Sequence, residues 1–135
     1  MKISLNGKDY KIKFGYKPTL KERIISRVIK YANIIDADGN QDMEKVEDLL
    51  LFVPEFLLVG LQVNHKDFRY NYDTKEGKNE QLEKVYKIVD DYLNEDDADI
   101  LQLFNSLQEA LMEDSFLSSL FKREQEKIAN AENAV

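Results

Sequence analysis

Residues 49–61 read LLLFVPEFLLVGL, and this is the most apolar stretch of the chain. As a helix it is apolar on nearly every side around Pro54, and such a helix either lies at the centre of a fold or is covered by a partner. The stretch is shorter than the roughly 20 residues that cross a bilayer, and Pro54 and Glu55 interrupt it, so we expect no membrane span. We expect a helix from about Asp42 that either kinks at Pro54 or is followed there by a new helix.

Amphipathic segments lie on both sides of this stretch. Before it, Thr19 and Glu22 have the spacing of a capping box, which predicts a helix from Thr19 to the turn-rich residues 36–40. Its apolar stripe contains Leu20, Ile24, Val28 and Ile35, with Ile25, Ile29 and Ala32 beside them. After it, the composition predicts a loop with aromatic anchors at residues 64–79, then helices over 80–93, from the acidic run 94–97 to about residue 111, and from a Ser115 cap to 121.

The first sixteen residues, MKISLNGKDYKIKFGY, predict a β-hairpin. Asn6-Gly7 is the preferred pair for a two-residue type I′ turn, because both positions need a positive φ. This turn places Leu5 opposite Lys8, and one face of the hairpin then collects Ile3, Leu5, Tyr10, Ile12, Phe14 and Tyr16. A lone hairpin is marginal in water, so we expect this apolar face to pack on the helices or on another chain.

The length and composition fit one domain. The chain has 135 residues, of which 43% are hydrophobic and 33% charged, and such a chain can bury a core without a metal or a disulfide. We predict a mainly helical α+β fold, with an N-terminal β-hairpin packed on a bundle of about five helices. The predicted ranges are 1–121 for a single globular domain (hairpin 1–16, helical part 19–121) and 122–135 for a polar C-terminal tail that frays.

Charge is distributed unevenly along the chain. Residues 1–30 carry a net charge of +7, whereas residues 31–135 carry −14. Opposite charges on two parts of a molecule favour head-to-tail association of its copies. No nucleic-acid-binding motif accompanies the basic residues, so we expect a solvated basic face and no nucleic acid as partner. The opening residues, MKISL, have no apolar run of signal-peptide length, and we expect a cytosolic protein.

Residue counts exclude several kinds of site. The chain has no cysteine and a single histidine, His65, which excludes disulfides, thiolate metal sites, a cysteine nucleophile and His-rich metal sites. His65 is a candidate general base for a hydrolase, but we favour a packed surface histidine. The sequence contains no P-loop, dinucleotide-binding fingerprint or nucleophile elbow. We therefore expect no enzyme activity and no cofactor.

Residues 36–47, DADGNQDMEKVE, form the sharpest local pattern. They place oxygen-bearing side chains at the ligand positions of a twelve-residue EF-hand loop, between two predicted helices. The pattern departs from an EF-hand at Gln41, where the sharp turn needs glycine, and no second loop pairs with it. We favour a polar turn with Asp42 as a helix cap. The alternative is a small calcium-binding regulatory module with the ligands Asp36, Asp38, Asn40, Asp42 and Glu47.

Two weaker patterns have plain structural interpretations. The carboxylates of Asp96, Asp97 and Asp99 have the chemistry to hold a divalent ion, but the start of a solvated helix explains them equally well. Tyr70 and Tyr72 are able to stack on nucleic-acid bases, but their acidic neighbours repel phosphate. Neither pattern predicts a functional site.

Three stretches, taken in order, link the chain to a known family. They are ISLNGKDYKIKFGY at 3–16, FLLVGLQVNHKDFRYNYDTKEGK at 56–78 and ILQLFNSLQEALMEDSFLSSLF at 100–121. In order, length and character they resemble the tail assembly chaperones of long-tailed (siphovirus-type) bacteriophages and prophages of Gram-positive bacteria. The resemblance spans most of the chain and includes no catalytic signature, and the EF-hand-like turn is not part of the family pattern.

The resemblance implies a non-catalytic role in viral tail assembly. Such chaperones bind the tape-measure protein, keep it soluble and help to recruit the major tail-tube protein in the host cytoplasm, and they are absent from the finished virion. They self-associate, and they are often also made in a longer, frameshifted form. From this role and from the apolar character of residues 49–61 we expect partner contacts through four side chains, Phe52, Phe56, Leu57 and Leu61.

Overall fold

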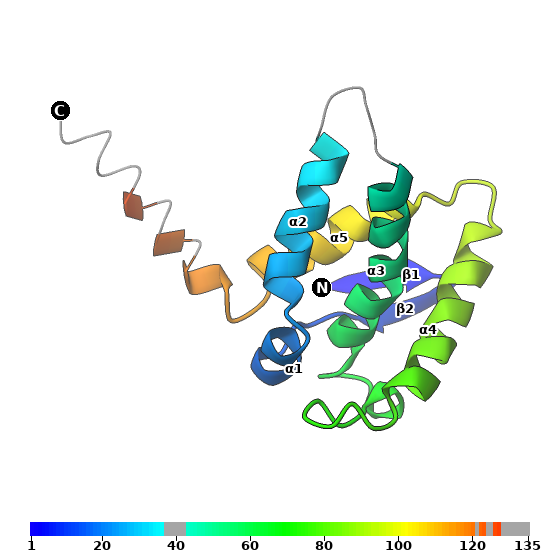
Figure 1. The fold of residues 1–135 in the computed structure, drawn as a ribbon, viewed down its shortest axis with the longest axis horizontal. Coiled ribbons are helices and arrows are strands. Elements are labelled where there is room, and N and C mark those ends of the chain that lie inside the picture. Colours follow the sequence, from blue (N-terminus) through cyan, green and yellow to red (C-terminus); the bar gives the residue numbers. More distant parts are fainter. Residues whose placement is uncertain (37–42, 121, 124–125, 128–135) are drawn as a thin grey trace.

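The computed structural model describes residues 1–36, 43–120, 122–123 and 126–127. These residues form the predicted mainly helical α+β fold, in which an N-terminal antiparallel hairpin packs against helices (Figure 1). The elements are β1 (Lys2–Leu5), β2 (Lys8–Lys11), α1 (Tyr16–Lys21), α2 (Ile24–Asp36), α3 (Met43–Leu61), the 3-10 helix η1 (Lys66–Phe68), α4 (Lys78–Leu93) and α5 (Ile100–Glu113).

Helix α3 lies at the centre of the fold, and α2, α4 and α5 pack against it. From Phe52 to Leu61 every side chain except that of Glu55 is buried. The helix continues through Pro54, so no new helix begins there. The proline removes the backbone donor to the carbonyl of Leu50, and Leu50 is 39% exposed, so water can reach this part of the helix. Within the described residues no helix combines the length and the apolar character that a membrane crossing needs.

Aromatic rings fill the space around the middle of α3. The Phe52 and Phe56 rings stack with their centroids 5.2 Å apart. Phe14, which follows the hairpin, lies 5.0 Å from Phe56, and Tyr31 of α2 lies 4.9 Å from Phe52. Phe104 of α5 completes the cluster with an edge-on contact to Phe56 at 5.9 Å. Two helices, α2 and α5, and the hairpin exit therefore meet on this one turn of α3.

The hairpin has the predicted register. Leu5 pairs with Lys8 and Ile3 with Tyr10, and both turn residues, Asn6 and Gly7, have the positive φ that a type I′ turn requires. The predicted apolar face is buried at Ile3, Leu5, Tyr10, Ile12 and Phe14. Tyr16 was expected on the same face, but it begins α1 and is 68% exposed. The strand pattern ends before Tyr16 because the chain has already turned into a helix.

Gly60 allows the hairpin to approach α3 closely. The amide of Lys13 donates to the carbonyl of Gly60 at 3.0 Å, directly after β2. A Cβ atom at residue 60 would lie 3.0 Å from Ile12 and 3.1 Å from Phe14, which is tighter than ordinary van der Waals contact. At the turn, the Asn6 side-chain amide donates to the carbonyl of Ile88 in α4. The hairpin is thus held against α3 at one end and against α4 at the other.

The predicted continuous helix from Thr19 is divided into α1 and α2. Arg23 has a φ of 52°, which ends the first helix and redirects the chain. Helix α1 begins earlier than predicted, with Gly15 as its N-cap, so the predicted Thr19–Glu22 capping box is wrong. Glu22 instead follows the last residue of α1 and is buried. Its ion pairs with lysines more than 50 residues away explain why a local pattern does not describe it.

The C-terminal helices follow the sequence closely, with two shifts. Helix α4 contains the predicted range 80–93, whereas α5 begins at Ile100, after the acidic run 94–97. Its N-cap is Asp99, whose carboxylate accepts from the amides of Leu101 and Gln102. The Ser115 hydroxyl accepts a hydrogen bond from the amide of Leu117, but Phe116 and Leu117 form a turn and the helical residues begin at Ser118, so the predicted cap lies too early.

Candidate functional site: an apolar groove between two helices

The four side chains expected to contact a partner lie in the core. Phe52 and its three companions Phe56, Leu57 and Leu61 are each at most 1% exposed. The hairpin, α2, α4 and α5 surround this part of α3, which leaves no side of it open to another protein in this fold. The correction has a simple physical reason: the rest of the chain supplies enough apolar surface to cover the most apolar helix. A partner surface therefore has to be sought elsewhere.

An apolar groove of about 240 Å³ lies between α2 and α5. Both helices pack on α3, and the groove is the space they leave between them. Helix α2 contributes Ile25, Val28, Ile29, Ala32 and Asn33, helix α5 contributes Gln108, Leu111 and Met112, and Leu117 closes one end. On each helix these residues are three or four positions apart, which is the spacing of a single helical face. The groove is thus formed by two apolar stripes that face one another.

Several of these apolar side chains are open to solvent. Ile29 is 59% exposed and Met112 is 39% exposed, whereas Ile24 on the same helix as Ile29 is fully buried. Helix α2 therefore has more apolar positions than its contact with α3 covers. This surplus is visible in the sequence, where Ile25, Ile29 and Ala32 lie beside the predicted core stripe.

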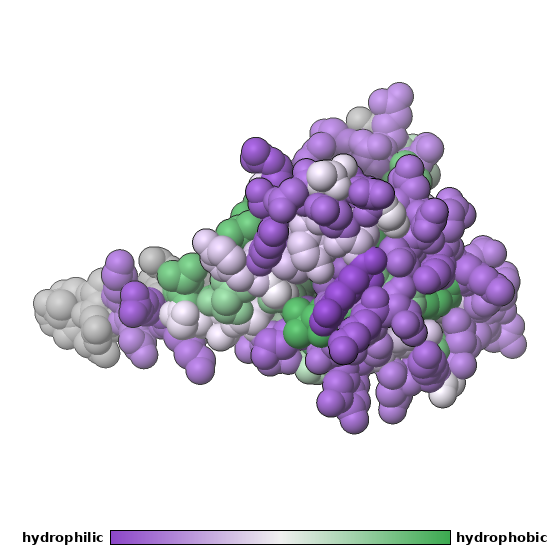
Figure 2. Space-filling view, turned by 90° about the horizontal axis from the view of Figure 1, so that it is seen from below, coloured by the Kyte–Doolittle hydropathy of each residue, from purple (hydrophilic) through white to green (hydrophobic). Residues whose placement is uncertain are grey.

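The apolar surface continues from the groove to the C-terminal segment. Leu117 is buried against the core, but Leu120 is 54% exposed. Phe116 meets the exposed ring of Tyr16 edge-on at 5.2 Å. Seen from below, apolar residues gather where the C-terminal segment joins the body, and the rest of this face is mostly polar (Figure 2). The groove is therefore part of a wider apolar region at this end of the molecule.

The lining of the groove is mostly apolar. None of the described residues that line it is titratable, and Asn33 and Gln108 are its polar members. Side-chain amides both donate and accept hydrogen bonds, so they can satisfy polar groups at the edge of an apolar ligand. What the groove offers is apolar area, bounded by the two helix faces.

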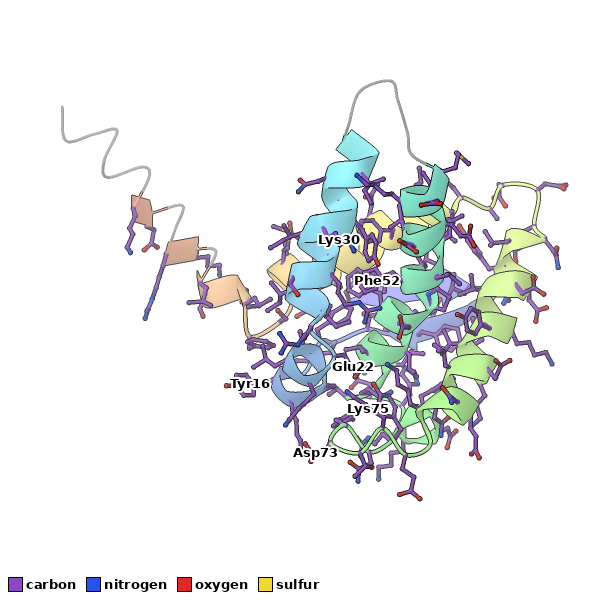
Figure 3. The ribbon with its side chains drawn as sticks, viewed as in Figure 1. Tyr16, Glu22, Lys30, Phe52, Asp73 and Lys75 are labelled. Atoms are coloured by element: carbon purple, nitrogen blue, oxygen red, sulfur yellow. The ribbon has the colours of Figure 1, made fainter. Side chains whose placement is uncertain are left out.

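A network of charged residues, none of which lines the groove, ties several elements of the fold together. The Glu22 carboxylate pairs with both Lys75 and Lys78, and Glu55 pairs with Lys78 and Arg27. These residues come from the α1–α2 junction, α2, α3, the loop before α4, and α4 itself. Glu22 and Lys75 lie next to each other, and Asp73 lies farther out on the same loop (Figure 3). The network fixes the loop of residues 64–77 against the helices.

Burial and the two lysines act in opposite directions on the pKa of Glu22. Burial by itself raises the pKa, but the hydrogen bonds and positive charges of Lys75 and Lys78 outweigh it, so the pKa is below the usual 4.5. Glu22 is therefore ionised at neutral pH. Nearby, burial first and the Glu22 charge second raise the pKa of Tyr70. The network thus holds the Glu22 carboxylate in a charged, paired state.

The remaining candidates from the sequence have structural roles. His65 Nε2 lies 3.2 Å from the carbonyl of Lys11, and its ring packs against Tyr10 and Phe68, so the residue is packed at the surface as favoured above. Tyr70 is buried and meets Tyr72 edge-on, which leaves it out of reach of a nucleic-acid base.

The calcium-site hypothesis concerns residues that the structure largely leaves undescribed. The loop carrying Asp38, Asn40 and Asp42 and the side chain of Asp36 lie outside the described residues. Glu47, the remaining ligand of the hypothesis, is exposed on α3, which already begins at Met43. Among the described residues no three acidic or histidine side chains form a metal-binding group. This includes Asp96, Asp97 and Asp99.

No protein-family model, curated protein or solved structure matches the chain. The assignment of a function therefore rests on the residues and geometry described above and on the resemblance of the three sequence stretches. The α2–α5 groove is the feature on which a binding function can be built.

Proposed function

We propose that the protein is a non-catalytic binding protein that shields an amphipathic helix in the groove between α2 and α5. In this proposal it acts as a tail assembly chaperone of a phage or prophage, which keeps the tape-measure protein soluble and helps to recruit tail-tube subunits. The observation that supports it is the open groove, with Ile29 and Met112 exposed on facing helices. Its site of action would be the host cytoplasm, and the finished virion would not contain it.

The geometry of the groove suits a helix as its occupant. Two parallel rows of apolar side chains at helical spacing leave a channel for the ridge of a third helix. Each large apolar side chain that moves from water into such a channel contributes roughly 1.5–3 kcal/mol. Asn33 and Gln108 at the edge can bond polar groups on the flanks of that helix. Apolar area alone binds without strong sequence preference, as solubilising a long partner requires.

The small size of the groove implies that several copies act together. A groove of about 240 Å³ covers a short part of one helix. A long partner therefore needs copies arranged along its length, and contacts between neighbouring copies raise the local concentration of sites. The opposite net charges of residues 1–30 and 31–135 favour such contacts. Self-association is part of the proposal for this reason.

Co-expression with the neighbouring tape-measure protein tests the proposal. We expect the soluble fraction of the tape-measure protein to rise in the presence of the wild-type chain and to fall again with Ile29→Glu. The matched control is Leu51→Glu, because Leu51 is 51% exposed on α3 and does not line the groove. Circular dichroism of both variants verifies that the fold is intact. An equal loss with both variants, or no effect of the wild-type chain, contradicts the proposal.

A further inference from the structure

A second docking surface lies at the free edge of the hairpin. The two-residue turn and the bond from the Ile12 amide to the Met1 carbonyl make Leu5–Lys8 and Ile3–Tyr10 the hydrogen-bonded pairs of the ladder. The backbone N–H and C=O groups of Lys2 and Ser4 therefore point away from β2. Within the described residues no hydrogen bond satisfies these four groups. Strand β1 thus presents an open edge.

The outer edge of β2 is more protected than that of β1. The carbonyl of Lys11, which points outward from β2, lies 3.2 Å from His65 Nε2. Two residues further on, the amide of Lys13 is bonded to Gly60 of α3. Covering an edge in this way is a common protection against unwanted strand pairing. In the described part of the chain all four outward groups of β1 are open, whereas β2 has its Lys11 carbonyl covered and is followed by a residue bound to α3, so β1 is the more open edge.

A crevice of about 500 Å³ runs along the open edge of β1. Residues 1–5 form one wall, and the α4–α5 connection and α5 form the other. The opposite wall carries three exposed carboxylates, those of Glu95, Asp97 and Glu109. Among the described residues none of the three has an ion-pair partner. The open backbone groups therefore face a wall of uncompensated negative charge.

We propose that β1 and this acidic wall bind an extended segment of another protein that carries lysine or arginine at alternate positions. The segment adds a strand to the hairpin through the free groups of Lys2 and Ser4. Alternate side chains of a strand point to opposite faces, so one set of basic side chains reaches the carboxylates of the wall. The negative wall disfavours an acidic segment by the same rule. This inference is independent of the α2–α5 groove and of the function proposed for it.

Amide hydrogen exchange of the full chain tests the inference with an internal control. The probe is an acetylated hexapeptide of alternating lysine and valine, and its control replaces each lysine by glutamate. At a saturating concentration of the lysine peptide we expect exchange at the Lys2 and Ser4 amides to slow by about tenfold. Exchange at Asp9 and Lys11, whose amides point out from β2, is expected not to change. Protection at all four amides, protection at neither pair, or an equal effect of the glutamate peptide overturns the inference.

A charge-neutralising variant tests the role of the acidic wall. We expect the double variant Glu95→Gln, Glu109→Gln to bind the lysine peptide about three- to tenfold more weakly, because exposed charges contribute modestly. The matched control, Asp90→Asn with Asp91→Asn, removes the same charge from α4 outside the crevice, and it should bind like the wild type. Equally weakened binding in both variants would contradict a specific role of the Glu95 and Glu109 carboxylates. Protection of Lys2 and Ser4 that rises with protein concentration in the absence of peptide identifies a second copy as the occupant and also overturns the inference.

Discussion

Two apolar regions of the molecule differ in their exposure to solvent. The second half of α3 is the most apolar part of the sequence, and its side chains from Phe52 to Leu61 are buried, apart from that of Glu55. Helix α2 is less apolar, yet Ile29 remains 59% exposed in the groove that α2 forms with α5. In this protein the most apolar segment forms the core. What stays exposed is the surplus of apolar side chains on the helices that cover that segment.

The two regions also differ in how they are enclosed. The Phe56 side chain is fully buried because the hairpin exit, α2 and α5 all reach it or its neighbour Phe52 through aromatic contacts. The groove has walls on two sides, and no third described helix lies over its opening. The groove is therefore open because no further described element covers it. Substitutions in the two regions should differ in their effect on stability.

The largest effect is expected from Phe56→Ala. Truncating a fully buried aromatic side chain costs about 3–5 kcal/mol of the free energy of unfolding, since it leaves a cavity in the core. Urea denaturation of the purified variant measures it. Leu51→Ala, in the exposed first half of the same helix, is the control, and it should cost less than about 1 kcal/mol. A similar small cost for both would mean that the second half of α3 is not the core of the fold.

The next largest effect on stability is expected from the charge network around Glu22. We expect Glu22→Gln to lower the free energy of unfolding at pH 7 by about 1–3 kcal/mol, because it removes charged hydrogen bonds at a buried position. Lys17 and Lys21 pair with Asp73 at the surface, where both partners are about half exposed. Asp73→Asn is therefore the control, with an expected change near zero. Equal losses in the two variants would contradict a special role for the buried carboxylate.

The same network sets an acid limit on stability. The pKa of Glu22 is lower in the folded protein than its usual value of 4.5, so the unfolded chain binds the proton more readily. The stabilisation is therefore complete above pH 4.5 and is lost as the pH falls through the lower, folded-state pKa. The exposed Asp73 and Asp114, with pKa values lowered by their cationic partners, act in the same direction. Glu22→Gln should flatten the acid side of a stability-against-pH curve measured by thermal unfolding, and an unchanged curve would contradict this.

The substitution Gly60→Ala adds one methyl group and tests how tightly the buried second half of α3 is packed. Gly60→Ala places a Cβ atom 3.0 Å from Ile12 and 3.1 Å from Phe14, and overpacking of this kind costs about 1–3 kcal/mol. The better helix propensity of alanine returns up to about 1 kcal/mol. We expect a net loss of about 1 kcal/mol in urea denaturation. Ala32→Val, which adds bulk in the open groove, should cost less, and the reverse order would mean that the groove is closed in solution.

The sequence predicted the features that depend on neighbouring residues. The hairpin register follows from Asn6-Gly7, and the range of α4 follows from an uninterrupted helical stripe. The break between α1 and α2 escaped prediction because Glu22 is held by Lys75 and Lys78, which are distant in the sequence. Long-range pairs of this kind leave no local pattern.

The four side chains expected to contact a partner are buried, and the open apolar groove lies between two other helices. The expected apolar contact surface was assigned to Phe52, Phe56, Leu57 and Leu61 because hydropathy ranks segments without saying which faces the fold covers. Ile25, Ile29 and Ala32 were visible as a surplus beside the core stripe of α2. That surplus becomes a groove only because Leu111 and Met112 of α5 lie opposite. The pairing of two such stripes depends on topology, which the sequence alone did not reveal.

The smallest effect on the free energy of unfolding is expected at the groove, where two isoleucines of α2 can be compared directly. Ile24 and Ile29 lie five residues apart on α2 but are 0% and 59% exposed. We expect Ile24→Ala to cost about 2–5 kcal/mol as a core truncation, whereas Ile29→Ala should change the free energy of unfolding by less than about 0.5 kcal/mol. Such a small cost would mean that the Ile29 side chain makes few contacts within its own fold and is accessible to another molecule. If Ile29→Ala proved as costly as Ile24→Ala, residue 29 would be part of the core in solution. That result would contradict the proposal that the groove binds a partner.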